Sequence, residues 1–115
     1  MTQETQGILS EEDEEFAEAL EQANSFSETL ALSKAAIYDM LCSGFGDEFS
    51  LTAINYAIEN INADFKYNAY KTALSYKNMG MDIQDIFKQL YSPAGERFTR
   101  EEAQFAIEQF SETAR

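Results

Sequence analysis

The sequence predicts an all-α fold of two tandem three-helix repeats, each containing a helix-turn-helix-like unit. Shifting the chain by about 49 residues, the period of the repeat, places one set of mostly apolar positions on a second, similar set. A match at a fixed period indicates duplicated supersecondary units. Apolar residues also recur at the spacing of amphipathic helices, and no segment alternates as a strand does. The matched pairs include Ile37 and Ile86, Leu41 and Leu90, Phe49 and Phe98, and Ile58 and Ile107.

The first repeat is expected over residues 11–62, behind a flexible N-terminal tail at residues 1–10. The tail is polar and contains Gly7, as unanchored chain ends often do. Ser10 is a suitable N-cap for a long first helix, because its hydroxyl can accept a backbone hydrogen bond and acidic residues follow at the positive end of the helix dipole. An apolar stripe then runs along this helix. Its residues are Phe16, Ala19, Leu20, Ala23, Phe26 and Leu30.

Two further helices complete the first repeat. Ser33 caps a short second helix, which ends at Gly44 and Gly46. Ser50 caps the third helix. The lone cysteine, Cys42, lies on the second helix, and we expect a buried or half-buried structural thiol because the chain has no His to activate it.

The second repeat, residues 63–112, follows the same plan. Asp64 caps its first helix and Asp82 caps its second. Thr99 and Glu102 form a capping box at the start of the last helix. The residues expected to end helices are Gly80, Pro93 and Gly95. With 115 residues, the chain is expected to form one compact domain or two repeats that share one core.

The negative charge of the chain is concentrated in its first half. The formal net charge is −13, from 21 acidic and 8 basic residues. Residues 1–62 hold 13 of these acids and one base, which gives −12 for this half. Such a field repels nucleic-acid phosphates and anionic membrane surfaces and attracts a basic partner. The alternative is that these acids simply form the solvent-exposed face of a helix and bind no partner.

If the charge serves binding, the candidate surface is an acidic face of the first repeat. A dense run of acids opens the first helix, and further acids follow within this repeat, where Lys34 is the one base. The candidate binding residues are Glu11, Glu12, Asp13, Glu14, Glu15, Glu18, Glu21, Asp39, Asp47 and Glu48.

The residue types argue against an enzyme, a metal site or a cofactor site. The chain has no His, no Ser–base pair and no glycine-rich phosphate loop, so a catalytic constellation cannot be assembled. The segment from Asn60 to Asp64 resembles the opening of a calcium loop, but Phe65 replaces the required Gly and Lys71 replaces the closing acid. We therefore expect no catalytic residues, no metal and no cofactor.

Nucleic-acid binding is also not expected, despite the helix-turn-helix-like units. A reading helix needs donors for base edges and cations for phosphates. The third helix of the first repeat, Leu51 to Ile61, contains no Lys or Arg, and its counterpart offers Arg97 and Arg100 beside acids. The charge pattern is thus the opposite of a DNA-binding footprint.

Two segments carry a resemblance to a known family. Residues 63–76 read Ala-Asp-aromatic, then Asn-Ala, then Ala-x-x-Tyr, and residues 98–108 read Phe-Thr-x-Glu-Glu-Ala-x-x-Ala-Ile. Together they resemble the Ltp-type repeat of host-cell-surface-exposed lipoproteins, found in Gram-positive bacteria and their prophages. The likeness extends over residues 16–110; in the first copy, Leu51-Thr52-Ala53 stands in place of the Glu-Glu-Ala run.

The resemblance implies a monomeric, non-enzymatic binding domain at the outer face of a Gram-positive cell membrane. In that family a lipidated Cys anchors the protein, and prophage members exclude superinfecting phage by blocking DNA injection, with the phage tape-measure protein as the proposed target. We expect the anchoring Cys to belong to a longer form of the protein, because Cys42 lies inside a predicted helix; otherwise this member is not a lipoprotein. The expected partner is a basic phage protein.

Two other functions remain open at the level of sequence. An acidic cytoplasmic protein could mimic DNA and occupy a nucleic-acid-binding protein. Alternatively, a host surface protein could carry the same repeats without a role in phage defence. A signal peptide with a lipobox Cys upstream would favour the surface location, and a prophage setting would favour phage defence.

Overall fold

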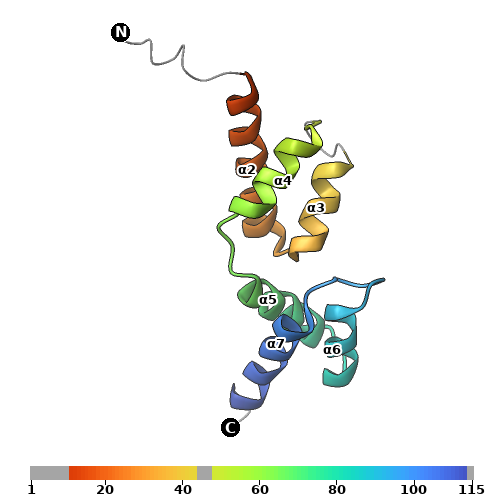
Figure 1. Cartoon of the computed structure of the whole chain (residues 1–115). Coiled ribbons are helices and arrows are strands. Elements are labelled where there is room, and N and C mark those ends of the chain that lie inside the picture. Colours follow the sequence, from red (N-terminus) through yellow and green to blue (C-terminus); the bar gives the residue numbers. More distant parts are fainter. Residues whose placement is uncertain (1–10, 44–47, 114–115) are drawn as a thin grey trace.

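The computed structural model describes residues 11–43 and 48–113, and within them the chain forms six α-helices and no strand. Figure 1 shows the helices as two groups of three that follow one another along the molecule. The helices are α2 (Glu11–Leu30), α3 (Lys34–Cys42), α4 (Leu51–Asn60), α5 (Phe65–Asn78), α6 (Ile83–Tyr91) and α7 (Arg100–Thr113). The predicted all-α fold of two three-helix repeats is confirmed. The predicted tail, with Ser10, and the glycines 44 and 46 lie outside the described residues.

Each repeat has a hydrophobic core of its own. One set of buried residues comes from α2, α3 and α4, and the other comes from α5 to α7 with the loop before α7. The expectation of a shared core is therefore wrong. The first core contains Ala19, Ala23, Ile37, Leu41, Ala53, Ile54 and Ala57. The second contains Ala69, Ala73, Ile86, Leu90, Phe98, Ala103, Ala106 and Phe110.

The matched pairs of the duplication occupy these cores to different depths. Five of the eight side chains are buried, namely Ile37, Leu41, Ile86, Leu90 and Phe98. The other three, Phe49, Ile58 and Ile107, are half-buried and pack at the edges of the cores.

Alanines set the closest helix pairs. α2 packs mainly on α4, and α5 packs mainly on α7. Each of these helices carries two fully buried alanines spaced three or four residues apart, which places them on one face of the helix. A side chain of one methyl group lets two helix backbones approach closely. The paired alanines are Ala19 and Ala23, Ala53 and Ala57, Ala69 and Ala73, and Ala103 and Ala106.

Most predicted helix caps form as expected. Three N-cap side chains accept a hydrogen bond from the backbone N–H three residues later, at 3.0–3.1 Å. They are Ser33, Ser50 and Asp64. Thr99 and Glu102 form the reciprocal capping box, with bonds of 2.9 and 3.1 Å. Asp82 occupies the N-cap position of α6 but makes no side-chain cap bond, so that part of the prediction is wrong.

The chain leaves the first helix of each repeat through a left-handed residue. Ala31 has a φ of 55° after α2, and Gly80 has a φ of 91° at the matching position after α5. Gly adopts this region without the steric cost that a Cβ adds. The first repeat thus tolerates an alanine at a position where the second repeat has the favoured glycine.

The loop between α6 and α7 lies against the end of α6. The backbone N–H of Glu96 donates to the carbonyl of Gln89 at 3.0 Å, and that of Phe98 donates to the carbonyl of Leu90 at 2.8 Å. Gly95 makes this approach possible, because a Cβ there would lie 2.3 Å from the Gln89 carbonyl oxygen.

Gly95→Ala should therefore destabilise the second repeat by about 1–3 kcal/mol, as the loop must move to relieve the clash. Urea unfolding monitored by circular dichroism measures the change. Ala94→Gly, at the neighbouring exposed residue, is the control and should change stability far less. Equal stability of Gly95→Ala and the parent chain would show that the loop does not depend on this contact.

Candidate binding surface

The acidic face predicted for the first repeat lies mainly on α2. Glu11, Glu12, Asp13 and Glu14 form the first turn of this helix, and their side chains are exposed. Acids at this position interact favourably with the positive end of the helix dipole. No Lys or Arg occurs anywhere in α2, so the helix itself offers no cation to these carboxylates.

Four of these acids share one side of α2. Glu11, Glu14, Glu18 and Glu21 follow one another at spacings of three or four residues, and such residues are neighbours on a helix surface. All four are exposed. Like charges at this spacing repel one another, and a cation bound along the face would relieve that repulsion.

Glu15 has a structural contact that the sequence did not indicate. Its carboxylate accepts a hydrogen bond from the Ser50 backbone N–H at 2.6 Å and another from the Ser50 hydroxyl at 3.2 Å. These bonds place a negative charge at the N-terminus of α4, where the helix dipole favours it. Glu15 thus joins α2 to α4 and is less available to a partner than the other acids of α2.

The remaining predicted residues lie away from the α2 face. Asp39, on α3, forms an ion pair with Arg97 of the second repeat. Glu48 is exposed before α4, beside the end of α3, and Asp47 lies outside the described residues. The structure therefore keeps most of the α2 acids exposed, with four of them on one side of the helix, and assigns Asp39 to the contact between the repeats.

Cys42 is exposed at the end of α3, which corrects the expectation of a buried or half-buried thiol. The inward positions of α3 are taken by Ile37 and Leu41, and the residue after Leu41 points elsewhere on the helix. The pKa of Tyr38 is raised mainly by a hydrogen bond with the Cys42 side chain, one helical turn away.

The two repeats meet through Phe65 of α5, which packs against the core of the first repeat, and through polar groups. Three polar residues are buried in the described part of the chain, and each of them makes a hydrogen bond across the junction. The Asn68 amide on α5 donates to the Ser27 hydroxyl at 2.9 Å and to the Leu32 carbonyl at 3.1 Å. The Ser33 hydroxyl donates to the Glu96 carbonyl at 2.6 Å. Because buried polar groups are costly when unpaired, these bonds favour one relative placement of the repeats.

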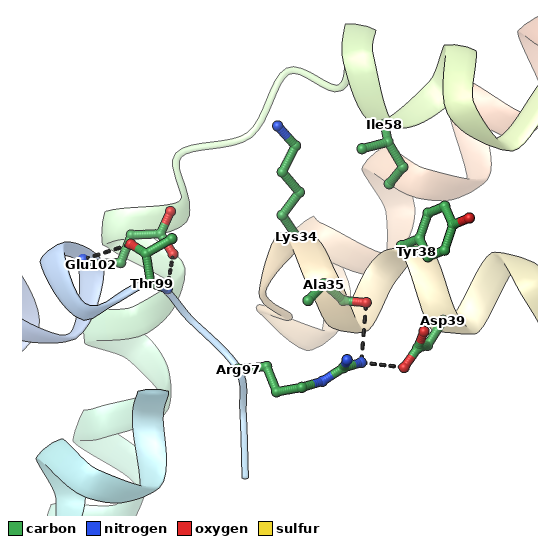
Figure 2. A pocket seen from close by; sticks show the side chains of 8 residues that line it. All are labelled: Lys34, Ala35, Tyr38, Asp39, Ile58, Arg97, Thr99 and Glu102. Atoms are coloured by element: carbon green, nitrogen blue, oxygen red, sulfur yellow. Dashed lines mark hydrogen bonds and ion pairs between the residues drawn. The ribbon is translucent and has the colours of Figure 1, made fainter. Parts of the chain in front are cut away.

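Arg97 extends from the α6–α7 loop to the first repeat. Its guanidinium donates to the Ala35 carbonyl at 3.2 Å and pairs with the Asp39 carboxylate (Figure 2). The backbone of Arg97 is left-handed, with a φ of 64°. A further bond between the repeats runs from the Thr72 hydroxyl, which donates to the Ala31 carbonyl at 3.2 Å.

Glu96 is fixed from three directions. Its backbone N–H bonds to α6 and its carbonyl accepts from Ser33, as described above, while its carboxylate accepts a hydrogen bond from the Tyr76 hydroxyl. The pKa of Tyr76 is raised above its usual value, mainly by partial burial of the hydroxyl and to a smaller extent by this hydrogen bond. The loop before α7 is thereby held both to its own repeat and to the first repeat.

A cleft of about 390 Å³ lies between the repeats next to Arg97 (Figure 2). Several of its polar side chains are already paired. Asp39 bonds to Arg97, and Thr99 and Glu102 form the capping box. The described residues contain no group of His, Cys, Asp and Glu side chains suited to a metal. The full lining is Lys34, Ala35, Tyr38, Asp39, Ile58, Arg97, Thr99 and Glu102.

The sequence matches the family model described as host cell surface-exposed lipoprotein twice, at residues 14–61 and 64–110. The chain belongs to this lipoprotein family. The first match runs from the first turns of α2 to the end of α4, and the second runs from the N-cap of α5 to near the end of α7. Each copy of the family repeat therefore coincides with one three-helix unit and one core.

A solved structure is also similar to this lipoprotein-family chain. It is that of Ltp, a superinfection exclusion protein from the Streptococcus thermophilus temperate phage TP-J34. The TM-score is 0.73 at 30% sequence identity, over 82% of this chain and 93% of that one. Comparison with curated proteins finds no match. Within its described residues, this lipoprotein-family chain has no helix of sufficient length and apolar character to span a membrane.

The second lipoprotein repeat differs from the first in its electrostatics. Four of its cations lie over aromatic rings, with Arg100 over both Phe87 and Tyr91 at 5.5 and 5.2 Å from the ring centroids. Such contacts are attractive because the ring face is negative. The other pairs are Lys66 with Phe105, Lys71 with Tyr67, and Lys77 with Phe110. The cations of the chain are thus concentrated in one repeat, and the exposed acids of α2 lie in the other.

Proposed function

We propose that the chain is a non-enzymatic binding domain that excludes superinfecting phage by capturing a basic phage component, with the tape-measure protein as the candidate. In this proposal the full-length lipoprotein is anchored at the outer face of a Gram-positive cell membrane, where it meets the incoming phage. Family membership and the similarity to a superinfection exclusion protein support the proposal. The observation that carries it is the exposed acidic face of α2.

The α2 face is suited to fast capture of a basic protein. Clustered charges of one sign steer an oppositely charged partner and raise the association rate. The acids lie at one end of an elongated molecule of 61 × 27 × 21 Å, and α2 begins at the end opposite to the last turn of α7 (Figure 1). Capture there would withhold a basic phage protein needed for DNA injection.

Neutralising the α2 face should remove protection without unfolding the chain. The variant carries Glu11→Gln, Glu12→Gln, Glu14→Gln and Glu18→Gln, all at exposed positions. Exposed charge pairs contribute about 0.2–1 kcal/mol each, so loss of four should weaken capture by about fourfold to several hundredfold. Plaque formation on cells that display the anchored protein measures protection. Association with the recombinant tape-measure protein at increasing salt measures the electrostatic component.

The matched control neutralises four exposed acids of the second repeat. It carries Asp82→Asn, Asp85→Asn, Glu101→Gln and Glu108→Gln, and it should retain protection and salt-dependent association. Circular dichroism and surface labelling establish that both variants are folded and displayed. Full protection by the α2 variant would remove the electrostatic mechanism. A parent chain that is displayed yet gives no protection would instead favour a host surface role unrelated to phage.

A further inference from the structure

A groove between α2 and α4 combines an apolar floor with an acidic wall. Its apolar part, called the groove floor below, is made by Ala17 and Leu20 of α2 and by Tyr56 of α4, and the polar Asn24 and Ser25 of α2 also line the groove. Glu21 and Glu28 line it from α2, and both are exposed. The hollow has a volume of about 550 Å³. It extends the acidic side of α2, since Glu21 belongs to both surfaces.

The tyrosine that bounds the groove is held in place. The Tyr56 ring stacks on Phe16, with the ring centroids 4.9 Å apart and an angle of 25° between the planes. Phe16 itself packs against the core of the first repeat. Tyr56 nevertheless remains 36% exposed, so one part of its surface is fixed by packing and another is open to a partner.

We propose that this groove binds one amphipathic helix whose cations are spaced two helical turns apart. The inference rests on the proposed function and assigns a conformation to the basic partner. Glu21 and Glu28 are seven residues apart on one helix, which separates them by about 10.5 Å along its axis. A partner helix lying along α2 presents Lys or Arg at the same seven-residue spacing, and its apolar face covers Leu20 and Tyr56.

Charge and apolar surface together select this occupant over an unstructured basic chain. An extended basic segment could neutralise the acids at the start of α2, but it has no continuous apolar face to cover the groove floor. A helix with apolar residues at spacings of three and four and with flanking cations matches both parts. α2 and α4 are already packed on each other, so the groove exists before the partner arrives.

The test uses the whole chain and two synthetic peptides of identical composition. One is an 18-residue Leu/Lys amphipathic helix with lysines seven residues apart, and the other is a scrambled sequence without an apolar face. We expect the first to bind at least about tenfold more tightly by calorimetry, because only it can bury the groove floor. Its amide chemical-shift changes should be largest for residues 17–28 and around Tyr56. Equal affinity for the two peptides would overturn the inference.

Three variants separate this groove from the rest of the acidic face. Glu21→Gln with Glu28→Gln should weaken binding of the amphipathic peptide by about twofold to thirtyfold. The matched pair, Glu11→Gln with Glu12→Gln, removes the same charge at the start of α2 and should have a smaller effect. Ala17→Arg, at an exposed position, should block the groove with little effect on folding.

The outcomes distinguish the groove from the proposed function. Equal losses for the two charge pairs, or unchanged binding by Ala17→Arg, would overturn the groove while leaving electrostatic capture intact. Absence of binding by both peptides would also overturn it. The proposed function is judged separately by the plaque assay with the four-residue α2 variant, which leaves Glu21 and Glu28 in place.

Discussion

Leu90→Ala is expected to unfold the second repeat at a lower urea concentration while the first repeat stays folded, and Leu41→Ala is expected to do the reverse. Each leucine is buried in the core of its own repeat. Truncating a buried leucine costs about 2–5 kcal/mol, through lost burial and the cavity that remains. Because the two cores share no buried apolar residue among those that the structure describes, the loss should stay largely within one repeat. Residue-resolved NMR during a urea titration measures both repeats at once.

Exposed leucines provide matched controls for these truncations. Leu51, on α4, is 59% exposed, and Leu74, on α5, is 37% exposed. Leu51→Ala and Leu74→Ala should shift the midpoints much less, because little apolar surface is lost on truncation. If Leu41→Ala and Leu90→Ala instead shift both repeats together by the same amount, the chain folds as one cooperative unit. The hydrogen bonds of the junction would then couple the repeats more strongly than separate cores suggest.

The local features of the fold could be predicted from sequence because they depend on residues close together in the chain. The caps at Ser33, Ser50 and Asp64 and the capping box before α7 each involve groups about three residues apart. The duplication also identified the central apolar positions. Asp82 was the exception, since the residue type favours a cap but does not ensure that the bond forms.

The separation into two cores could not be predicted, because periodicity shows which face of a helix is apolar but not what covers it. Either a shared core or two separate cores would bury the same stripes. In this chain the Asn68 amide occupies the contact between the repeats, where it bonds to Ser27 and Leu32. The sequence did place a polar residue, Asn68, beside Ala69 and Ala73 on the inward face of α5. It could not show which groups Asn68 would bond to.

The candidate surface could be predicted only in part, because the sequence does not show contacts between residues that are far apart in the chain. A count of charges along the chain located the acids of α2, which are neighbours in sequence. It could not show that Arg97 pairs with Asp39, 58 positions away, or that Glu15 caps α4 through Ser50, 35 positions away. It also missed the groove, because Tyr56 reaches α2 only through the packing of α4.

Asn68→Ala should release the fixed orientation of the two repeats. The substitution removes the donor to the Ser27 hydroxyl and the Leu32 carbonyl. Leaving a buried polar group unpaired costs about 1–3 kcal/mol for each group affected. Since the cores themselves do not contain Asn68, each repeat should keep its helices while the junction weakens. Small-angle scattering should then give a larger radius of gyration for the variant than for the parent chain, whose Cα atoms have a radius of gyration of 17.3 Å in this structure. The residual dipolar couplings of the two repeats should no longer fit one relative orientation.

Asn55→Ala is the matched control, because Asn55 is exposed on α4 and should leave both measurements unchanged. A second variant, Arg97→Gln, tests the same junction through a different contact by removing the charge that pairs with Asp39. The exposed ion pair is screened by salt, so its effect on the scattering should diminish as ionic strength rises, whereas the effect of Asn68→Ala should persist. If Asn68→Ala leaves the dipolar couplings consistent with one orientation, the remaining contacts of Ser33, Thr72 and Arg97 are sufficient to hold the repeats together. The buried amide would then contribute stability to the junction without determining its geometry.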